Sequence, residues 1–264
     1  MEIKLHGKKA IISGSTTGIG FAIAKELARA GAAVLINGRT EKRVEEAVNR
    51  LKVELPEAKA TGFAADLGSP TGVTQLLSFY PEADILINNL GIYEPKPFFE
   101  ITDEDWEEYF QVNLMSAVRL SRHYGQGMLQ NGWGRILFNG SVTAGFHSGE
   151  MVHYGATKAA LLGLSRGLAE SMERSGVTVN VFIPGPTRTE NVEQFLQEHI
   201  SSTGKTFAEW EEEMLTTSLQ TSLLKRFVTP HEVANFVVFL ASEQASAITG
   251  TAMRVDGGIV RSLL

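Results

Sequence analysis

Two side chains with complementary acid–base chemistry, Tyr154 and Lys158, stand four residues apart in a segment with helical spacing. Residues four apart share one face of a helix, so the phenol and the ammonium are expected to lie close together. A nearby cation stabilises a phenolate and could lower the tyrosine pKa from its usual value near 10 by about 3 units. The spacing therefore predicts a general acid–base suited to neutral pH. Such pairs also arise by chance, so other motifs have to support this one.

A glycine-rich turn, GSTTGIG over residues 14–20, follows a short apolar run and precedes a helical pattern. Glycine lets the backbone turn sharply and approach a pyrophosphate, and the helix behind it offers free N–H groups with a positive partial charge. The spacing differs from the common GxGxxG, and a plain tight turn would also use glycine. The position after the first predicted strand favours dinucleotide binding. The candidate contacts are Gly14, Ser15, Thr17, Gly18, Ile19 and Gly20.

The residues that would meet the adenosine ribose lie about twenty positions further on, at the end of the second predicted strand. Residues 36–40 contain Arg39 and no Asp or Glu. An arginine pairs with a ribose 2′-phosphate, and no carboxylate is present to repel that phosphate. Arg39 therefore favours NADP, with NAD possible. Thr17 occupies the loop position where a second basic contact could stand, and Arg39 could instead be a surface residue beside Glu41.

Short apolar runs alternate with helical segments along the whole chain, which predicts one α/β domain over residues 1–264. The expected fold is a doubly wound Rossmann fold, with a mostly parallel seven-stranded sheet and helices on both faces. Capping motifs begin predicted helices at Ser69, Thr102, Thr206 and Thr229. The predicted strands cover residues 10–12, 34–36, 60–65, 84–88, 135–139, 177–183 and 252–255, and two long helices cover 103–129 and 152–174.

The segment from Pro184 to Val228 is the one long connection in this pattern. Connections of this length usually carry function. We predict a substrate lid at about 186–228, to which Phe195 and Trp210 would contribute apolar surface. Ordinary packing of these aromatic residues is the alternative.

Composition excludes several classes of protein. The chain has 24 basic and 30 acidic residues, a net charge of −6, which argues against nucleic acid or an anionic membrane as the main partner. The absence of cysteine excludes disulfides, thiolate nucleophiles and cysteine-bound metals, and the six histidines show no metal-binding spacing, so no metal site is predicted. We find no targeting segment and no apolar run near the ~20 residues that span a bilayer, and we expect a cytoplasmic protein.

Together these motifs resemble the short-chain dehydrogenase/reductase family, in its simple single-domain branch, over essentially the whole chain. Ser13 stands where threonine is usual and keeps the hydroxyl, and Leu90 stands where alanine is usual and adds bulk. The matching segments are the glycine loop from Ser13 to Gly20, Asp66-Leu67, Asn88-Asn89-Leu90-Gly91, Pro184-Gly185-Pro186-Thr187 and the ending 253–258.

The resemblance implies a catalytic set of Asn113, Ser141, Tyr154 and Lys158. Tyr154 would exchange a proton with the substrate oxygen while a hydride moves to or from nicotinamide, and Ser141 would hydrogen-bond that oxygen. Lys158 would lower the tyrosine pKa and hold the nicotinamide ribose, and Asn113 would position a water that relays protons. Besides the glycine loop and Arg39, the implied cofactor contacts are Asp66, Leu67, Asn89, Gly91, Tyr154, Lys158, Pro184, Gly185 and Thr187.

The predicted function is therefore an NAD(P)(H)-dependent oxidoreductase that interconverts a small-molecule secondary alcohol and its carbonyl, with NADP preferred. A 3-oxoacyl-thioester reductase acting through the same site is one alternative, and a non-catalytic cofactor-binding regulator is another, which the complete catalytic set disfavours. The resemblance also implies a homotetramer packed through the helices at 103–129 and 152–174. Candidate residues at the pocket edge are Tyr93, Glu94, Thr143, His147, His153 and Thr187.

Overall fold

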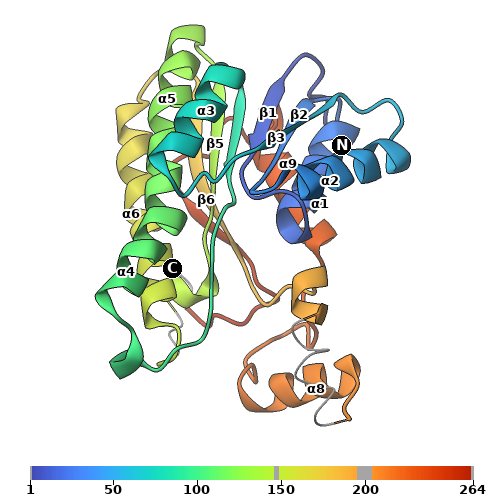
Figure 1. Cartoon of the computed structure of the whole chain (residues 1–264), viewed down its shortest axis with the longest axis vertical. Coiled ribbons are helices and arrows are strands. Elements are labelled where there is room, and N and C mark those ends of the chain that lie inside the picture. The colour runs from blue at the N-terminus through green and yellow to red at the C-terminus, as the bar shows by residue number, and fades with distance from the viewer. Residues whose placement is uncertain (1, 146–148, 195–203, 263–264) are drawn as a thin grey trace.

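Seven strands form one sheet in the order β3-β2-β1-β4-β5-β6-β7 (Figure 1). The structure is a computed structural model that describes residues 2–145, 149–194 and 204–262. Within these residues every strand pair of the sheet is parallel, so the prediction of a mostly parallel seven-stranded sheet is confirmed. The strands are β1 (Lys9–Ile12), β2 (Ala33–Gly38), β3 (Ala60–Ala64), β4 (Ile85–Asn88), β5 (Gly134–Asn139), β6 (Val177–Pro184) and β7 (Ala252–Val255).

Helices cover both faces of the sheet (Figure 1). On one face α1 (Gly18–Arg29), α2 (Glu41–Glu54) and α9 (Pro230–Leu240) share a buried apolar cluster with the strands. On the other face a second cluster joins α3 (Pro70–Phe79), α5 (Ser116–Asn131) and α6 (Val152–Ser171) to the same strands. This is the doubly wound Rossmann arrangement that the alternating pattern predicts.

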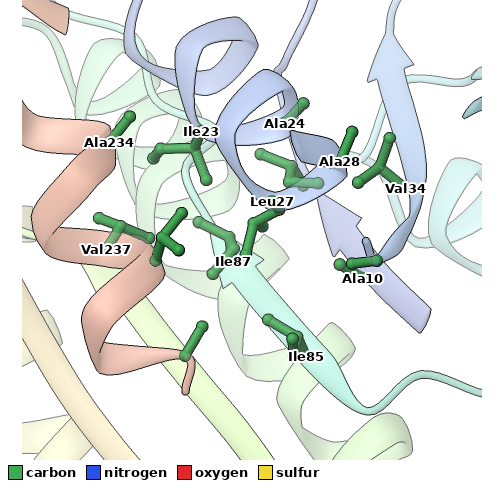
Figure 2. Packing of buried hydrophobic residues seen from close by; sticks show 14 of the residues in the cluster. Ala10, Ile23, Ala24, Leu27, Ala28, Val34, Ile85, Ile87, Ala234 and Val237 are labelled. Carbon is green, nitrogen blue, oxygen red and sulfur yellow. The ribbon is translucent and has the colours of Figure 1, made fainter. Parts of the chain in front are cut away.

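Alternate residues of each strand point to opposite faces, and this alternation divides the core in two. Ile11 packs toward α3 and α5, whereas its neighbours Ala10 and Ile12 pack toward α1 and α9. Burying an aliphatic side chain of this size contributes roughly 1.5–3 kcal/mol, so the two clusters fix the positions of the strand ends. Figure 2 shows the first cluster, where Ile23, Ala24, Leu27, Ala28, Ala234 and Val237 from the helices meet Ala10, Val34, Ile85 and Ile87 from the strands.

Side-chain caps begin the helices where the sequence predicts them. Thr102, Thr206 and Thr229 each form a complete capping box, and Ser69 caps α3 ahead of Pro70. Each cap satisfies backbone N–H groups that the helix itself leaves free, which contributes about 1 kcal/mol per helix. The boundaries that position the site are therefore set locally by the sequence.

The helix predicted at 103–129 is not continuous. It divides into α4 (Asp103–Tyr109), a π-helical turn (Phe110–Met115) and α5, which ends at Asn131. A π-helical turn inserts an extra residue into the helix and often occurs at functional sites. Here the turn contains the candidate catalytic residue Asn113, whose side chain is 1% exposed.

Residues after β6 form a region with its own small core. The predicted helix there is α8 (Phe207–Thr217), which stands apart from the sheet in Figure 1. Trp210 packs against Phe207 and Phe227, with ring centroids 6.1 and 5.6 Å apart. Leu215, Leu219, Phe227 and Ile259 are the buried members of this cluster.

Candidate active site

The predicted site residues gather at the carboxyl edge of the sheet, beside the point where the strand order reverses. β1 and β4 pair here, although β2 and β3 separate them in the chain. Gly14 follows β1, Asn89 follows β4 and Ser141 follows β5. Open α/β sheets bind ligands outside this edge at such a reversal. The topology thus brings the predicted cofactor-binding and catalytic residues into one region.

The glycine loop is tightly packed against its neighbours. Gly14 has a left-handed φ of 61°, and a Cβ there would lie 3.1 Å from the Cα of Leu90. A Cβ on Gly20 would lie 2.5 Å both from the carbonyl oxygen of Gly14 and from Nδ2 of Asn89. Gly20 leaves no room for a side chain, and Gly14 combines a tight contact with a left-handed backbone, so the loop requires glycine to hold this shape.

The helix that follows the loop begins without a side-chain cap. Its N-cap residue Thr17 makes no capping hydrogen bond, so the first N–H groups of α1, at Gly18, Ile19 and Gly20, keep the positive end of the helix dipole open to an anion. Asn191 donates a hydrogen bond from Nδ2 to Oγ1 of Thr17 at 3.4 Å. The start of the predicted lid segment therefore lies directly against the glycine loop.

Three asparagine and serine side chains fasten this loop to the neighbouring strands. Oδ1 of Asn37 accepts the Gly14 N–H at 3.1 Å, and Nδ2 donates to the carbonyl oxygens of Phe63 and Ala65 at 3.2 Å. Asn89 donates from Nδ2 to the carbonyl of Gly14 at 2.8 Å. The hydroxyl of Ser15 accepts the Asn37 N–H at 3.0 Å and is buried. The loop is thus held by hydrogen bonds to β2 and β4.

Arg39 lies immediately after β2 and is exposed. It makes no hydrogen bond or ion pair with any residue that the structure describes. The preceding Gly38 approaches the glycine loop, because a Cβ there would lie 2.5 Å from the methyl group of Thr16. An unpartnered guanidinium beside the loop can form a bidentate pair with a phosphate.

The remaining predicted cofactor contacts occupy the same edge in different ways. Asp66 is exposed after β3 and accepts the Gly68 N–H at 3.0 Å, whereas Leu67 is 1% exposed and belongs to the core. Pro184 ends β6, and a Cβ on Gly185 would lie 2.8 Å from the Cα of Asp256. The Thr187 hydroxyl donates to the carbonyl of Gly185 at 2.8 Å and is almost fully buried. Backbone groups and apolar side chains thus form most of this part of the predicted cofactor site.

Ser141, Tyr154 and Lys158 form the catalytic cluster. The Ser141 side chain hydrogen-bonds the phenol of Tyr154. The Nζ of Lys158 lies 5.5 Å from the centroid of the tyrosine ring and donates to the carbonyl oxygen of Asn139 at 2.7 Å. Asn139 in turn donates from Nδ2 to Oδ1 of Asn89 at 2.9 Å. This chain of hydrogen bonds connects the catalytic lysine to the residue that fastens the glycine loop.

Asn113 joins the same region through the π-helical turn. Its Oδ1 accepts the Ile92 N–H at 2.8 Å, and its Nδ2 donates to the carbonyl of Ile92 and to the hydroxyl of Thr157, both at 3.1 Å. A Cβ on Gly91 would lie 3.4 Å from both Oδ1 of Asn113 and Nζ of Lys158. The structure therefore brings all four predicted catalytic residues together, with Asn113 bound firmly to the loop after β4.

Burial, not charge pairing, controls the acid–base groups. Removal from water raises the pKa of Tyr154 to about 12, although the hydrogen bond from Ser141 acts in the lowering direction. Removal from water also lowers the pKa of Lys158 to about 8. In this structure the Lys158 ammonium points to the Asn139 carbonyl and contributes no lowering, so the expectation that it lowers the tyrosine pKa stays a prediction. The phenol is protonated at neutral pH.

The site fits a dinucleotide phosphate on three independent observations. The start of α1 is uncapped, the glycine loop excludes side chains, and Arg39 offers an unpaired cation at the end of β2. These groups supply N–H donors and positive charge where a negatively charged ligand would need them. Among the described residues no group of His, Cys, Asp or Glu could hold a metal ion, and no helix is long and apolar enough to cross a membrane.

Residues 14–260 match the family model described as enoyl-(acyl carrier protein) reductase. The chain belongs to the short-chain dehydrogenase/reductase family. Among curated relatives, an uncharacterized oxidoreductase of Bacillus subtilis, YvaG, is 46% identical over the full length of both chains. The 3-oxoacyl-[acyl-carrier-protein] reductase FabG of Aquifex aeolicus is 36% identical and is covered fully by 98% of this chain. The predicted family and the prediction of an oxidoreductase are confirmed.

A solved structure of another family member has the same architecture. L-sorbose reductase from Gluconobacter frateurii, complexed with NADPH and L-sorbose, superposes with a TM-score of 0.92 at 34% identity and with complete coverage of both chains. The prediction of a doubly wound Rossmann fold is thus confirmed by a family member as well as by the strand order.

The pocket-edge candidates separate into two groups. Tyr93 is exposed, and its ring centroid lies 6.0 Å from that of Tyr154, so it borders the catalytic phenol. His153 is 1% exposed and its ring centroid lies 4.0 Å from that of Tyr109, so it is a packing residue and the prediction that it lines the substrate pocket is wrong. Glu94 is exposed beside Tyr93. Thr143 contacts Ser141, Trp210 packs within the α8 cluster, and His147 and Phe195 lie outside the described residues.

Sequence reasoning missed the residues that hold the site together. Asn37 and Asn139 carry no reaction chemistry, yet one fixes the glycine loop and the other receives the lysine. Their signal was their position at a strand end: Asn37 directly follows the predicted strand 34–36, and Asn139 is the last residue of the predicted strand 135–139, where a polar side chain can bridge to a neighbouring strand. The contact of Asn191 with Thr17 had no local signal, because 174 positions separate the two residues.

Proposed function

We propose that this short-chain dehydrogenase/reductase is an NADP(H)-dependent reductase of small ketones, able to run the reverse oxidation of secondary alcohols. One observation carries the proposal. Ser141 hydrogen-bonds a phenol, on Tyr154, that burial keeps protonated, and Lys158 lies on the same helix four residues on. A protonated phenol is the form that donates a proton to a carbonyl oxygen.

Each member of the cluster has a separate task. The nicotinamide supplies the hydride when it is bound. Tyr154 delivers its proton to the substrate oxygen, and Ser141 donates a hydrogen bond to the negative charge that develops there. The Nζ of Lys158 lies 5.5 Å from the centroid of the tyrosine ring and carries a positive charge there below pH 8. Asn113 holds the loop after β4 through Ile92, so that Gly91 stays beside Lys158.

Arg39 supports NADP as the preferred cofactor. It is an exposed guanidinium without a described partner, at the end of the strand that precedes the adenosine region, and residues 36–40 contain no carboxylate. The related L-sorbose reductase was solved with NADPH. The glycine loop and the uncapped start of α1 would hold the pyrophosphate.

A small ketone suits the chain better than a substrate delivered on an acidic carrier protein. The net charge is −6, and no cluster of basic residues offers a docking surface in the sequence. Tyr93 presents an exposed ring at the catalytic phenol, against which the C–H groups of a compact substrate can pack. The relatives include an acyl-carrier-protein reductase, so a 3-oxoacyl thioester is the second candidate substrate.

The test follows NADPH consumption by the purified protein with a ketohexose, a simple aliphatic ketone and a 3-oxoacyl thioester. We expect the ketones to be reduced faster than the thioester. Tyr154→Phe should lower turnover by about a thousandfold, because it removes the general acid, while NADPH still binds. Tyr80→Phe, which alters a half-buried tyrosine at the end of α3, is the matched control and should keep full turnover. Unchanged turnover by Tyr154→Phe would refute the proposal.

The proposal includes two structural parts. Residues 186–228 act as the substrate lid of a single domain, which the contact of Asn191 with the glycine loop supports. The chain assembles in the cytoplasm as a homotetramer through the predicted helices 103–129 and 152–174, which correspond to α4 to α5 and to α6. Light scattering on the purified protein measures the assembly directly, and a monomeric mass would contradict it.

A further inference from the structure

The Ser141 hydroxyl is held by a neighbour that the catalytic set does not include. Ser141 has extended backbone geometry and begins the short 3-10 turn Val142–Ala144. Its Oγ accepts the backbone N–H of Thr143 at 3.2 Å. The same Oγ also accepts the Thr143 hydroxyl at 2.8 Å. Both contacts come from a single residue two positions further along the chain.

These two bonds determine what Ser141 can still do. A serine hydroxyl has one proton to donate and two lone pairs that accept. The N–H and the hydroxyl of Thr143 occupy both lone pairs of the Ser141 Oγ, so the serine can take part in a third hydrogen bond only as the donor. Its remaining contact is with the phenol of Tyr154, where a donated hydrogen bond acts to lower the tyrosine pKa. The three contacts are therefore mutually consistent only if the Thr143 hydroxyl donates to Ser141 and the Ser141 hydroxyl donates to the phenol.

Thr143 has no competing partner for this bond. Its hydroxyl makes no other hydrogen bond to the residues that the structure describes. The side chain is half-buried on the turn that follows β5. Because the turn is three residues long, the backbone fixes the distance between the two hydroxyl groups, and the donor needs no distant element to hold it in place.

We propose that Thr143 is a positioning residue that fixes Ser141 as a hydrogen-bond donor, whose single proton turns from the Tyr154 phenol to the reacting oxygen when substrate binds. This inference rests on the proposed reductase function. A hydroxyl that accepts two hydrogen bonds becomes a stronger donor through polarisation along the chain of bonds. Such a donor stabilises the negative charge that develops on the substrate oxygen more than it stabilises the neutral ketone, which raises kcat.

Removing one hydroxyl tests the inference. Thr143→Val keeps the shape of the side chain and the backbone N–H bond but deletes the 2.8 Å contact. We expect kcat to fall about five- to tenfold, the size of one net hydrogen bond, with KM and NADPH affinity nearly unchanged. Thr143→Ser retains the hydroxyl and should restore most of the rate. Thr74→Val, which deletes an exposed threonine bond within α3, is the matched control and should leave kcat unchanged.

A further readout separates positioning from general damage to the fold. If the chemical step itself slows, the primary deuterium isotope effect measured with 4-deuterated NADPH should increase in Thr143→Val. Loss of folded protein would lower kcat and leave the isotope effect unchanged.

The outcomes distinguish this inference from the proposed function. If Tyr154→Phe loses turnover but Thr143→Val keeps the kcat of the wild type, the role of Thr143 would be overturned and the proposed reductase function would stand. A Thr143→Ser rate as low as that of Thr143→Val would also overturn it, because the hydroxyl would then not be the active group. Absence of turnover by the wild type on every ketone would refute the function and this inference with it.

Discussion

The two halves of the site satisfy their polar groups in opposite ways. In the cofactor half, which comprises the glycine loop with Ser15, Asn37 and Asn89, neutral side chains bond to backbone and to one another. In the catalytic half, around Tyr154, Lys158 and Asn139, a charged amine is 3% exposed and has one described partner, a carbonyl oxygen.

Buried atoms without partners occur in both halves. In the described structure Oδ1 of Asn139 and Nδ1 of His153 lie in or beside the catalytic half, and Oδ1 of Asn88 lies next to Asn89 of the cofactor half. Unsatisfied polar groups destabilise a fold, and perturbed groups collect where catalysis needs them. The buried ammonium of Lys158 therefore distinguishes the two halves: the cofactor half is a neutral scaffold, whereas the catalytic half sacrifices stability for its chemistry.

The largest effect on stability should come from removing the Asn37 hydrogen bonds in the cofactor half. Asn37→Asp keeps the size of the side chain but replaces the two donors that face the carbonyls of Phe63 and Ala65 with a buried negative oxygen. We expect a loss of at least about 3 kcal/mol in the free energy of unfolding, measured by urea denaturation. Asn49→Asp, on the exposed face of α2, is the matched control and should change stability by less than about 0.5 kcal/mol. Equal stability of the two variants would show that Asn37 is not structural.

The second largest effect should be an increase in the free energy of unfolding. Lys158→Met removes a buried charge whose pKa is lowered from 10.5 to about 8, a shift that corresponds to about 3 kcal/mol of destabilisation at neutral pH. Loss of the bond to Asn139 reduces the gain, so we expect the variant to be more stable by about 1–2 kcal/mol and inactive.

The pH dependence of that difference gives the sharper measurement. Below pH 8 the lysine is protonated in both the folded and the unfolded state, and the folded state carries the full cost of the buried charge. As pH rises from 8 toward 10.5 the folded lysine loses its proton first, so the wild type should gain stability relative to Lys158→Met. A stability difference that is constant over this range would contradict the assigned burial of charge.

The smallest effect should appear in the pH–rate profiles. Lys158, with a pKa of about 8, loses its proton well before Tyr154, with a pKa of about 12. Ketone reduction uses the protonated pair, so kcat/KM for reduction should decline above pH 8, while alcohol oxidation should rise over the same range. Steady-state rates in both directions test this, and parallel profiles for the two directions would contradict it.

Much of the fold could be predicted because its signals are local. Apolar runs located all seven strands, and the capping residues Ser69, Thr102, Thr206 and Thr229 located helix starts. The π-helical turn at Asn113 escaped prediction because its apolar spacing is that of an ordinary helix. The α8 cluster also escaped, since Trp210 meets Phe227 across residues whose path the sequence does not reveal.

The site was predictable as a set of residues but not as an electrostatic state. The spacing of Tyr154 and Lys158 indicated their common helix face, yet the direction of the ammonium depends on Asn139, which comes from another strand. Burial then sets both pKa values, and burial is a property of the whole fold. The bonds of Asn37 and Thr143 likewise depend on turn geometry that spacing alone does not give.

The most direct test of the account is a fluorescence titration of the purified protein with NADPH and, separately, with NADH. The Arg39 guanidinium has no partner among the described residues, so it should select the phosphorylated cofactor. We predict that NADPH binds at least about tenfold more tightly than NADH, and that Arg39→Ala removes this preference while Lys52→Ala, at the far end of α2, retains it. Equal affinity for the two cofactors, or a preference that survives Arg39→Ala, would contradict the account.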